Sequence, residues 1–139
     1  MSRIIYDSKT VFFMKIFDLI TRARLKDCIM TDNMVLYIVE EGEIGKAVGK
    51  GGINVRKLET KFKRKVKLAE FSLNVMTFIK NLVAPIQLAS TEETEGTLII
   101  AAKDLKSRGL LIGHSGTNLR FLESILKRYF PQIKEIKVK

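Results

Sequence analysis

The chain has 139 residues, of which 46% are hydrophobic and 29% are charged. That length accommodates one domain or two small ones, and the composition excludes a disordered chain. There are 25 basic and 15 acidic residues, which give a formal net charge of +10, and residues 46–67 carry nine of the basic residues and only one acidic residue. Charge focused in this way favours a polyanionic partner, although a solvated basic surface also explains it.

The remaining composition argues against several other classes of protein. Cys28 is the only cysteine, so the chain forms no intrachain disulfide and suits a reducing compartment. Charged residues interrupt the apolar positions near the N-terminus, which therefore lacks the pattern of a signal peptide. No apolar run is long enough to span a membrane. We therefore expect a soluble, cytoplasmic protein with no membrane partner.

In the first half of the chain, hydrophobic spacing predicts the order α-β-β-α-α-β. Apolar residues recur every three or four positions in the helices, and the strands are either continuously apolar or alternating. The predicted elements are a helix over 8–24, strands over 25–30 and 34–39, helical turns over 43–48, a helix over 53–62 and a strand over 65–71.

The second half predicts the same order again. Pro85 ends the first helix, Asp104 caps the next helix, and Pro131 ends the last one. The predicted elements are a helix over 74–84, strands over 86–91 and 96–102 connected by the acidic segment 92–95, helices over 104–111 and 117–130, and a strand over 133–138.

Two turns of the form Gly-x-x-Gly mark corresponding places in these halves. They occupy 49–52 and 113–116, 64 positions apart, and in the same register Arg56 aligns with Arg120. Apolar positions on either side of the turns align as well. Matching element order, turns and core positions indicate an internal repeat.

The repeat predicts two small α+β domains, residues 1–72 and residues 73–139. Each domain is expected to contain one three-stranded sheet with helices packed on one of its faces.

Nucleotide binding and catalysis find little support in the sequence. A phosphate loop of the Walker type requires one more residue than Gly45–Gly51 offers, and a hydroxyl residue after Lys50 that is absent. His114 is the single histidine, and no acidic residue is placed to orient its ring. One histidine and one cysteine do not form a structural zinc site. We therefore expect no enzyme activity, no catalytic residue, no metal and no cofactor.

Binding of single-stranded nucleic acid is the interpretation that remains. A Gly-x-x-Gly loop between two helices beside a sheet is typical of the K-homology (KH) domain, which binds about four nucleotides. We expect the amides of Gly51, Gly52 and Ile53 to hold phosphates that Lys50 and Arg56 neutralise. The candidate RNA-binding residues of the first half are Lys46, Gly49, Lys50, Gly51, Gly52, Ile53, Arg56 and Lys57.

An apolar groove beside this loop is expected to receive the bases. Candidates for its floor are Ile44, Val48, Ile53 and Val55, and plain core packing explains these four residues equally well. The basic residues after the loop have a plain alternative too, as a solvated helix face.

The second loop carries no formal charge at its two central positions. Its candidate RNA-binding residues are Gly113, His114, Ser115, Gly116 and Arg120. The backbone donors remain, so the loop either binds RNA with a smaller electrostatic share or has a structural role.

Three segments, residues 45–59, 66–72 and 78–85, closely resemble the tandem KH region of the NusA family of transcription factors, and the match covers nearly the whole chain. Segment 23–29 and the short length resemble the archaeal members. The resemblance implies type II KH domains, binding of nascent single-stranded RNA, and a role in elongation, termination or antitermination with RNA polymerase. It also places the RNA loops of the family on 49–52 and 113–116.

Two other functions are consistent with the same residues. One is an RNA-binding factor for the assembly of ribosomes or ribosomal RNA, and the other is a protein-interaction module whose second domain contacts RNA polymerase. In each case we expect the protein to act as a monomer.

Overall fold

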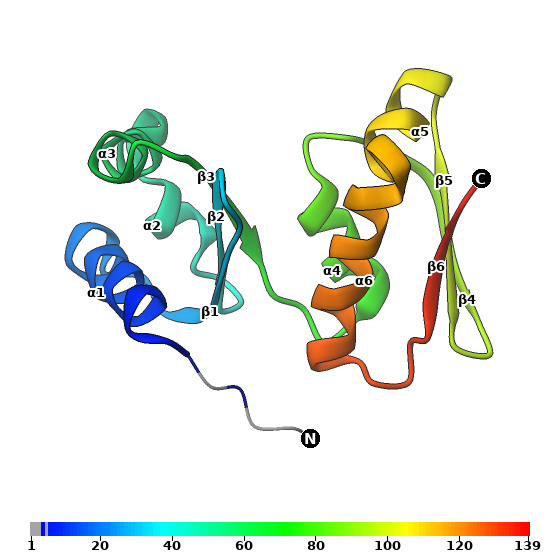
Figure 1. Cartoon of the computed structure of the whole chain (residues 1–139), viewed down its shortest axis with the longest axis horizontal. Coiled ribbons are helices and arrows are strands. Elements are labelled where there is room, and N and C mark those ends of the chain that lie inside the picture. Colours follow the sequence, from blue (N-terminus) through cyan, green and yellow to red (C-terminus); the bar gives the residue numbers. More distant parts are fainter. Residues whose placement is uncertain (1–3, 5) are drawn as a thin grey trace. The chain divides into compact units, whose positions relative to one another are not determined.

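The computed structural model describes residue 4 and residues 6–139 (Figure 1). By their contacts, the described residues form two compact units, Ile4–Ser72 and Leu73–Lys139. Each unit contains one three-stranded sheet and its own helices, so the fold is a mixed α+β fold, as the hydrophobic spacing predicts.

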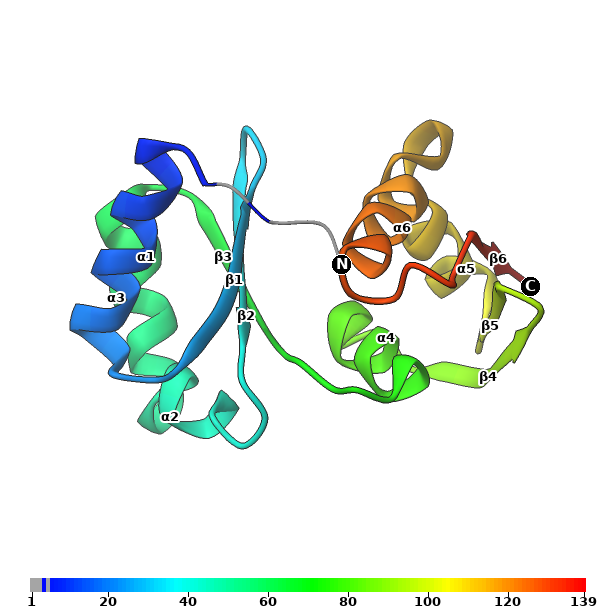
Figure 2. The ribbon, with the colours of Figure 1, turned by 90° about the horizontal axis from the view of Figure 1, so that it is seen from below.

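The first unit has the predicted order of elements. These are α1 (Ser8–Thr21), β1 (Leu25–Met30), β2 (Met34–Val39), α2 (Ile44–Val48), the 3₁₀ turn η1 (Lys50–Gly52), α3 (Ile53–Phe62) and β3 (Lys65–Glu70). In the sheet β2 is central, antiparallel to β1 and parallel to β3. Figure 2 shows α1, α2 and α3 on one face of this sheet.

The core of the first unit is built around β2, which is apolar along its whole length. Phe17 and Tyr37 are fully buried, and their ring centroids lie 4.4 Å apart. The hydroxyl of Tyr37 donates a hydrogen bond of 2.8 Å to the carbonyl oxygen of Phe13. The central strand is thereby joined to α1 by a polar bond inside an apolar core.

Helix α1 is shorter than its apolar spacing predicts. Asp7 caps its start by accepting a 2.7 Å bond from the Thr10 amide, which also holds the pKa of the Asp7 carboxyl below its ordinary value. Arg22 has a φ of 59°, in the left-handed region, and ends the helix there. The prediction that the helix continues to residue 24 is therefore wrong, because Ala23 and Arg24 already lead into β1.

The second unit repeats the order of the first. Its elements are α4 (Val75–Val83), β4 (Leu88–Thr94), β5 (Thr97–Ala102), α5 (Leu105–Ile112), the 3₁₀ turn η2 (His114–Gly116), α6 (Thr117–Tyr129) and β6 (Glu135–Val138). Strand β5 is central, antiparallel to β4 and parallel to β6, so the strand pairing also matches that of the first unit.

The acidic segment 92–95 is the clearest error of the predicted elements. Glu92 and Glu93 belong to β4 and pair with Ile99 and Leu98, and the hairpin turns only at Glu95–Gly96. β4 lies at the edge of its sheet, where acidic side chains face solvent without breaking the ladder. The charge of these residues therefore marks an exposed edge strand instead of a loop.

Helix α5 begins as predicted. The Asp104 carboxylate accepts a 2.7 Å bond from the Ser107 amide, and this bond holds the pKa of Asp104 below its ordinary value.

In the part of the chain that the structure describes, no helix is both long and apolar enough to cross a lipid bilayer.

Tyr37→Phe is expected to lower the free energy of unfolding by about 1–2 kcal/mol, because the buried hydrogen bond from the Tyr37 hydroxyl to the Phe13 carbonyl is lost. Burial, and after it the nearby Cys28, raises the pKa of the Tyr37 phenol above its ordinary value of 10.0. The folded state therefore holds this proton more tightly than the unfolded state, and the resulting stability is complete below pH 10 and declines above it.

Urea unfolding of both proteins from pH 7 to pH 11 measures this effect. The difference in unfolding free energy between wild type and Tyr37→Phe should shrink above about pH 10. A difference that stays constant over that range would contradict the raised pKa.

Candidate nucleic-acid interface

The turn between α2 and α3 has a backbone that favours glycine at three positions. Gly49, Gly51 and Gly52 have φ values of 78°, 61° and 77°. Residues other than glycine rarely adopt such positive φ values, because the conformation costs them about 1–2 kcal/mol. The turn therefore connects α2 to α3 within four residues, and α3 begins directly at Ile53.

Gly49 is needed for a second reason, which is a close approach by the side chain of Asn54. A Cβ at Gly49 would lie 2.8 Å from Nδ2 of Asn54. The same Nδ2 donates a 3.1 Å hydrogen bond to the carbonyl oxygen of Lys46 in α2. The Asn54 amide thus joins the start of α3 to α2 across the turn.

The outer edge of this turn is open. A Cβ at Gly51 would meet no atom within 4 Å, and Lys50 and Gly51 are both exposed. The amide of Gly52 donates to the carbonyl of Gly49 at 3.1 Å, and the amide of Ile53 donates to the carbonyl of Lys50. Two of the three amides expected to hold phosphates are therefore already engaged within the turn.

Arg56 holds a positive charge directly against the turn. Its Nη1 donates to the carbonyl oxygen of Gly51 at 2.5 Å and would lie 3.4 Å from a Cβ at Gly52. A guanidinium has five N–H donors, so this bond leaves others to bind an anion. The turn thus positions the Arg56 guanidinium where its remaining N–H groups can bind an anion at the same turn.

Lys46 lies in a different electrostatic environment. Glu43 precedes α2, and its carboxylate accepts a 2.8 Å bond from the Arg24 amide and lies 3.6 Å from the Arg24 guanidinium. The bond from the Arg24 amide is the main cause that lowers the pKa of Glu43, and Lys46 contributes to it through its charge. A carboxylate near Lys46 reduces what this lysine offers to an anionic ligand.

The second turn has the same geometry with different side chains. Gly113, Ser115 and Gly116 have φ values of 76°, 55° and 75°. Asn118 Nδ2 donates a 2.9 Å hydrogen bond to the Leu110 carbonyl, and Asn54 makes the corresponding bond to Lys46 in the first turn. Nη1 of Arg120 would lie 3.2 Å from a Cβ at Gly116. Ser115 has a positive φ, which costs a residue with a side chain about 1 kcal/mol. The corresponding residue of the first turn is Gly51, which has no such cost.

Two pairs of residues that hold these turns and helices are not evident from the hydrophobic spacing or from the Gly-x-x-Gly motif. Asn54 and Asn118 join the helices, whereas Glu59 and Glu123 accept 3.0 Å and 2.8 Å bonds from strand amides of β3 and β6. Both pairs lie in the 64-residue register of the two Gly-x-x-Gly turns. Extending the alignment along that register to polar residues would have found them.

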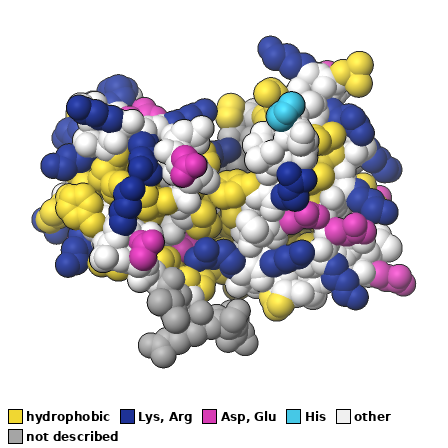
Figure 3. Space-filling model, viewed as in Figure 1, with side chains coloured by type: hydrophobic (Ala, Val, Ile, Leu, Met, Phe, Trp, Pro, Cys, Tyr) yellow, Lys and Arg dark blue, Asp and Glu magenta, His cyan; other side chains and the backbone are white. Residues whose placement is uncertain are grey.

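The four candidates for the groove floor differ in burial. Ile44 and Val55 pack against the core of the first unit, and Val48 is half-buried. Ile53 is 42% exposed and lines an open hollow between α1 and α3. Figure 3 shows hydrophobic side chains flanked by Lys and Arg over this side of the first unit.

A family model described as "KH domain" matches residues 14–82. A protein of Methanocaldococcus jannaschii named "Probable transcription termination protein NusA" is 36% identical, over 99% of this chain and 76% of its own length. Proteins of the same name from Methanococcus vannielii and Thermoplasma acidophilum are 32% and 27% identical, over 98% and 100% of this chain and 80% and 98% of their own lengths.

A solved structure, the crystal structure of APE1850, has the same fold. Its TM-score is 0.72 at 23% identity, and the match covers 96% of this chain and 100% of that one.

Gly49→Ala is expected to lower the free energy of unfolding by about 2 kcal/mol, because the new Cβ meets Asn54 and the backbone stays in the left-handed region. Gly45→Ala is the matched control, since Gly45 lies within α2 and its Cβ would meet no atom within 4 Å. That control should be neutral or stabilising by about 0.5–1 kcal/mol. Equal unfolding free energies for the two variants in urea would contradict the constraint at Gly49.

Proposed function

The chain belongs to the archaeal NusA family, and from this premise we propose that it binds single-stranded RNA and acts in transcription elongation, termination or antitermination. The observation that carries the proposal is the first Gly-x-x-Gly turn. It combines an open backbone at Gly51, an exposed cation at Lys50 and a guanidinium that the turn itself holds at Arg56.

The first turn would bind the phosphates of about four nucleotides, as KH loops do. At Gly51 no side chain blocks the approach of an RNA backbone, and Lys50 and Arg56 neutralise its charge. The proposed RNA contacts of the first unit are Lys46, Gly49, Lys50, Gly51, Gly52, Ile53, Arg56 and Lys57.

We assign the two compact units to two KH domains of type II, residues 1–72 and 73–139. The repeated element order and strand pairing support this assignment. The proposed contacts of the second domain are Gly113, His114, Ser115, Gly116 and Arg120. With no formal charge on His114 or Ser115 at neutral pH, this loop adds less to RNA affinity than the first.

The RNA partner that fits the family is the nascent transcript, bound by a monomer that also contacts RNA polymerase. A protein contact through the second domain is a second candidate, and the observation behind it is that helix α5 exposes 86% of Leu105 and 51% of Leu110.

The double substitution Lys50→Asp and Gly51→Asp is expected to weaken binding of single-stranded RNA by at least about tenfold, because it reverses the charge at the open edge of the turn. Fluorescence anisotropy with labelled RNA measures the change. The matched variant His114→Asp and Ser115→Asp adds the same kind of charge to the second turn and should have a smaller effect.

Circular dichroism must show that both double variants remain folded. Unchanged RNA affinity in the folded Lys50→Asp and Gly51→Asp protein would reject the RNA-binding role of the first turn.

Crosslinking in cells followed by RNA sequencing tests the role in transcription. We expect nascent transcripts to be enriched and RNA polymerase to be recovered with the protein at moderate salt. Enrichment of mature ribosomal RNA would instead indicate a factor for ribosome assembly. Recovery of polymerase by a protein whose two turns have both lost RNA binding would indicate a protein-interaction module.

A further inference from the structure

The first unit has a basic hollow that the Gly-x-x-Gly turn does not include. It lies between α1 and α3, and its lining residues are Ile20, Ile53, Arg56, Lys57, Thr60 and Lys61. Half of these side chains are cationic, none is acidic, and two are branched and apolar. A surface of this chemistry suits a ligand that combines negative charge with apolar faces, as a single-stranded nucleic acid does.

Two cations of this hollow have no acidic partner within the part of the chain that the structure describes. Lys57 and Lys61 lie one helical turn apart and repel each other. Among residues 4 and 6–139, no carboxylate is within salt-bridge distance of either lysine. Glu59 is the one acidic residue of α3, and its Oε2 accepts a 3.0 Å hydrogen bond from the Val66 amide of β3.

The hollow is continuous with the turn. Ile53 is the first residue of α3 and directly follows the turn, and Arg56 lines the hollow while its Nη1 bonds the carbonyl of Gly51. An RNA strand whose phosphates bind at the turn can therefore extend directly into the hollow. Along α3, the distance from Ile53 to Lys61 is about 12 Å at 1.5 Å per residue, room for more than one nucleotide.

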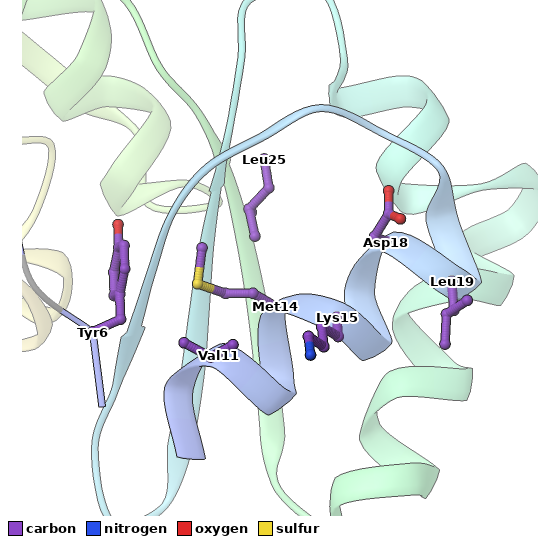
Figure 4. A pocket seen from close by; sticks show the side chains of 7 residues that line it. All are labelled: Tyr6, Val11, Met14, Lys15, Asp18, Leu19 and Leu25. Carbon is purple, nitrogen blue, oxygen red and sulfur yellow. The ribbon is translucent and has the colours of Figure 1, made fainter. Parts of the chain in front are cut away.

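A second hollow in the same unit lacks this charge pattern. Figure 4 shows its lining, in which Lys15 and Asp18 of α1 are the charged residues, with Val11, Met14 and Leu25 nearby. Its charges balance, so it does not favour a polyanion. The difference in charge separates the two hollows and provides a control for experiments on the first.

We propose that the hollow between α1 and α3 binds the nucleotides that flank, on one side, those held by the first turn. Phosphates contact Lys57 and Lys61, and a base lies against Ile20 and Ile53. This subsite rests on the proposed function, because it extends the same RNA strand. It contains no aromatic residue, so the base contact is apolar and tolerant of sequence.

The test is a length series of labelled single-stranded RNAs, from four to ten nucleotides, extended separately at the 5′ end and at the 3′ end. Wild type should gain affinity beyond four nucleotides from extension at one end only. The logarithm of its affinity should also depend more steeply on the logarithm of the salt concentration for the long RNA, by about 1.4, because two further phosphates are neutralised.

Lys57→Gln with Lys61→Gln should remove most of this gain with length and the extra salt dependence. The matched control is Lys15→Gln with Lys65→Gln, which removes two charges from the same unit at exposed positions outside the hollow. The control should keep the gain. A 2-aminopurine base at the flanking position should change its fluorescence on binding wild type, and change less with Ile53→Gln.

Several results would overturn the subsite. These are an intact gain with length in the Lys57→Gln and Lys61→Gln protein, an equal loss in the control, or a wild type that gains nothing from longer RNA. The last result would leave the hollow to another anionic partner, such as an acidic protein segment. Failure of the proposed function is distinguishable, because Lys50→Asp with Gly51→Asp would then leave binding of the four-nucleotide RNA unchanged.

Discussion

The hydrogen bond from the Asn54 amide to the Lys46 carbonyl is the contact on which the candidate interface depends. It holds α3 against α2, and it allows no Cβ at Gly49 between them. With both helices held, the turn can stay open at its outer edge, where a Cβ at Gly51 would meet no atom within 4 Å. A loop held by its own helices needs little reorganisation to bind a ligand, so less affinity is lost on binding.

Beside this turn, the basic side chains of α3 form an exposed positive surface. Arg56 is bonded to the turn itself, and Lys57 and Lys61 continue the positive surface along α3 without acidic partners among the described residues. The acidic Glu59 faces β3 instead, where it satisfies a strand amide. The same helix therefore uses its carboxylate for folding and leaves its cations exposed, where the proposed RNA would lie.

The second unit keeps the geometry of the turn with a different charge. Asn118 repeats the bond of Asn54, and Glu123 repeats that of Glu59. His114 and Ser115 nevertheless stand where the first turn has Lys50 and Gly51. The corresponding hydrogen bonds thus account for the similar geometry of the two turns. Their difference in charge predicts that the first turn contributes more to RNA affinity than the second.

Local patterns in the sequence determined the order of elements, the two turns and the helix cap at Asp104, because they depend on neighbouring residues and on backbone preference. Only the tertiary structure decided which side chains meet. It left Ile53 exposed at an open hollow and placed Glu92 in an edge strand. It also bonded Asn54 to a carbonyl eight residues away. Such contacts depend on how helices and strands pack, which hydrophobic spacing does not specify.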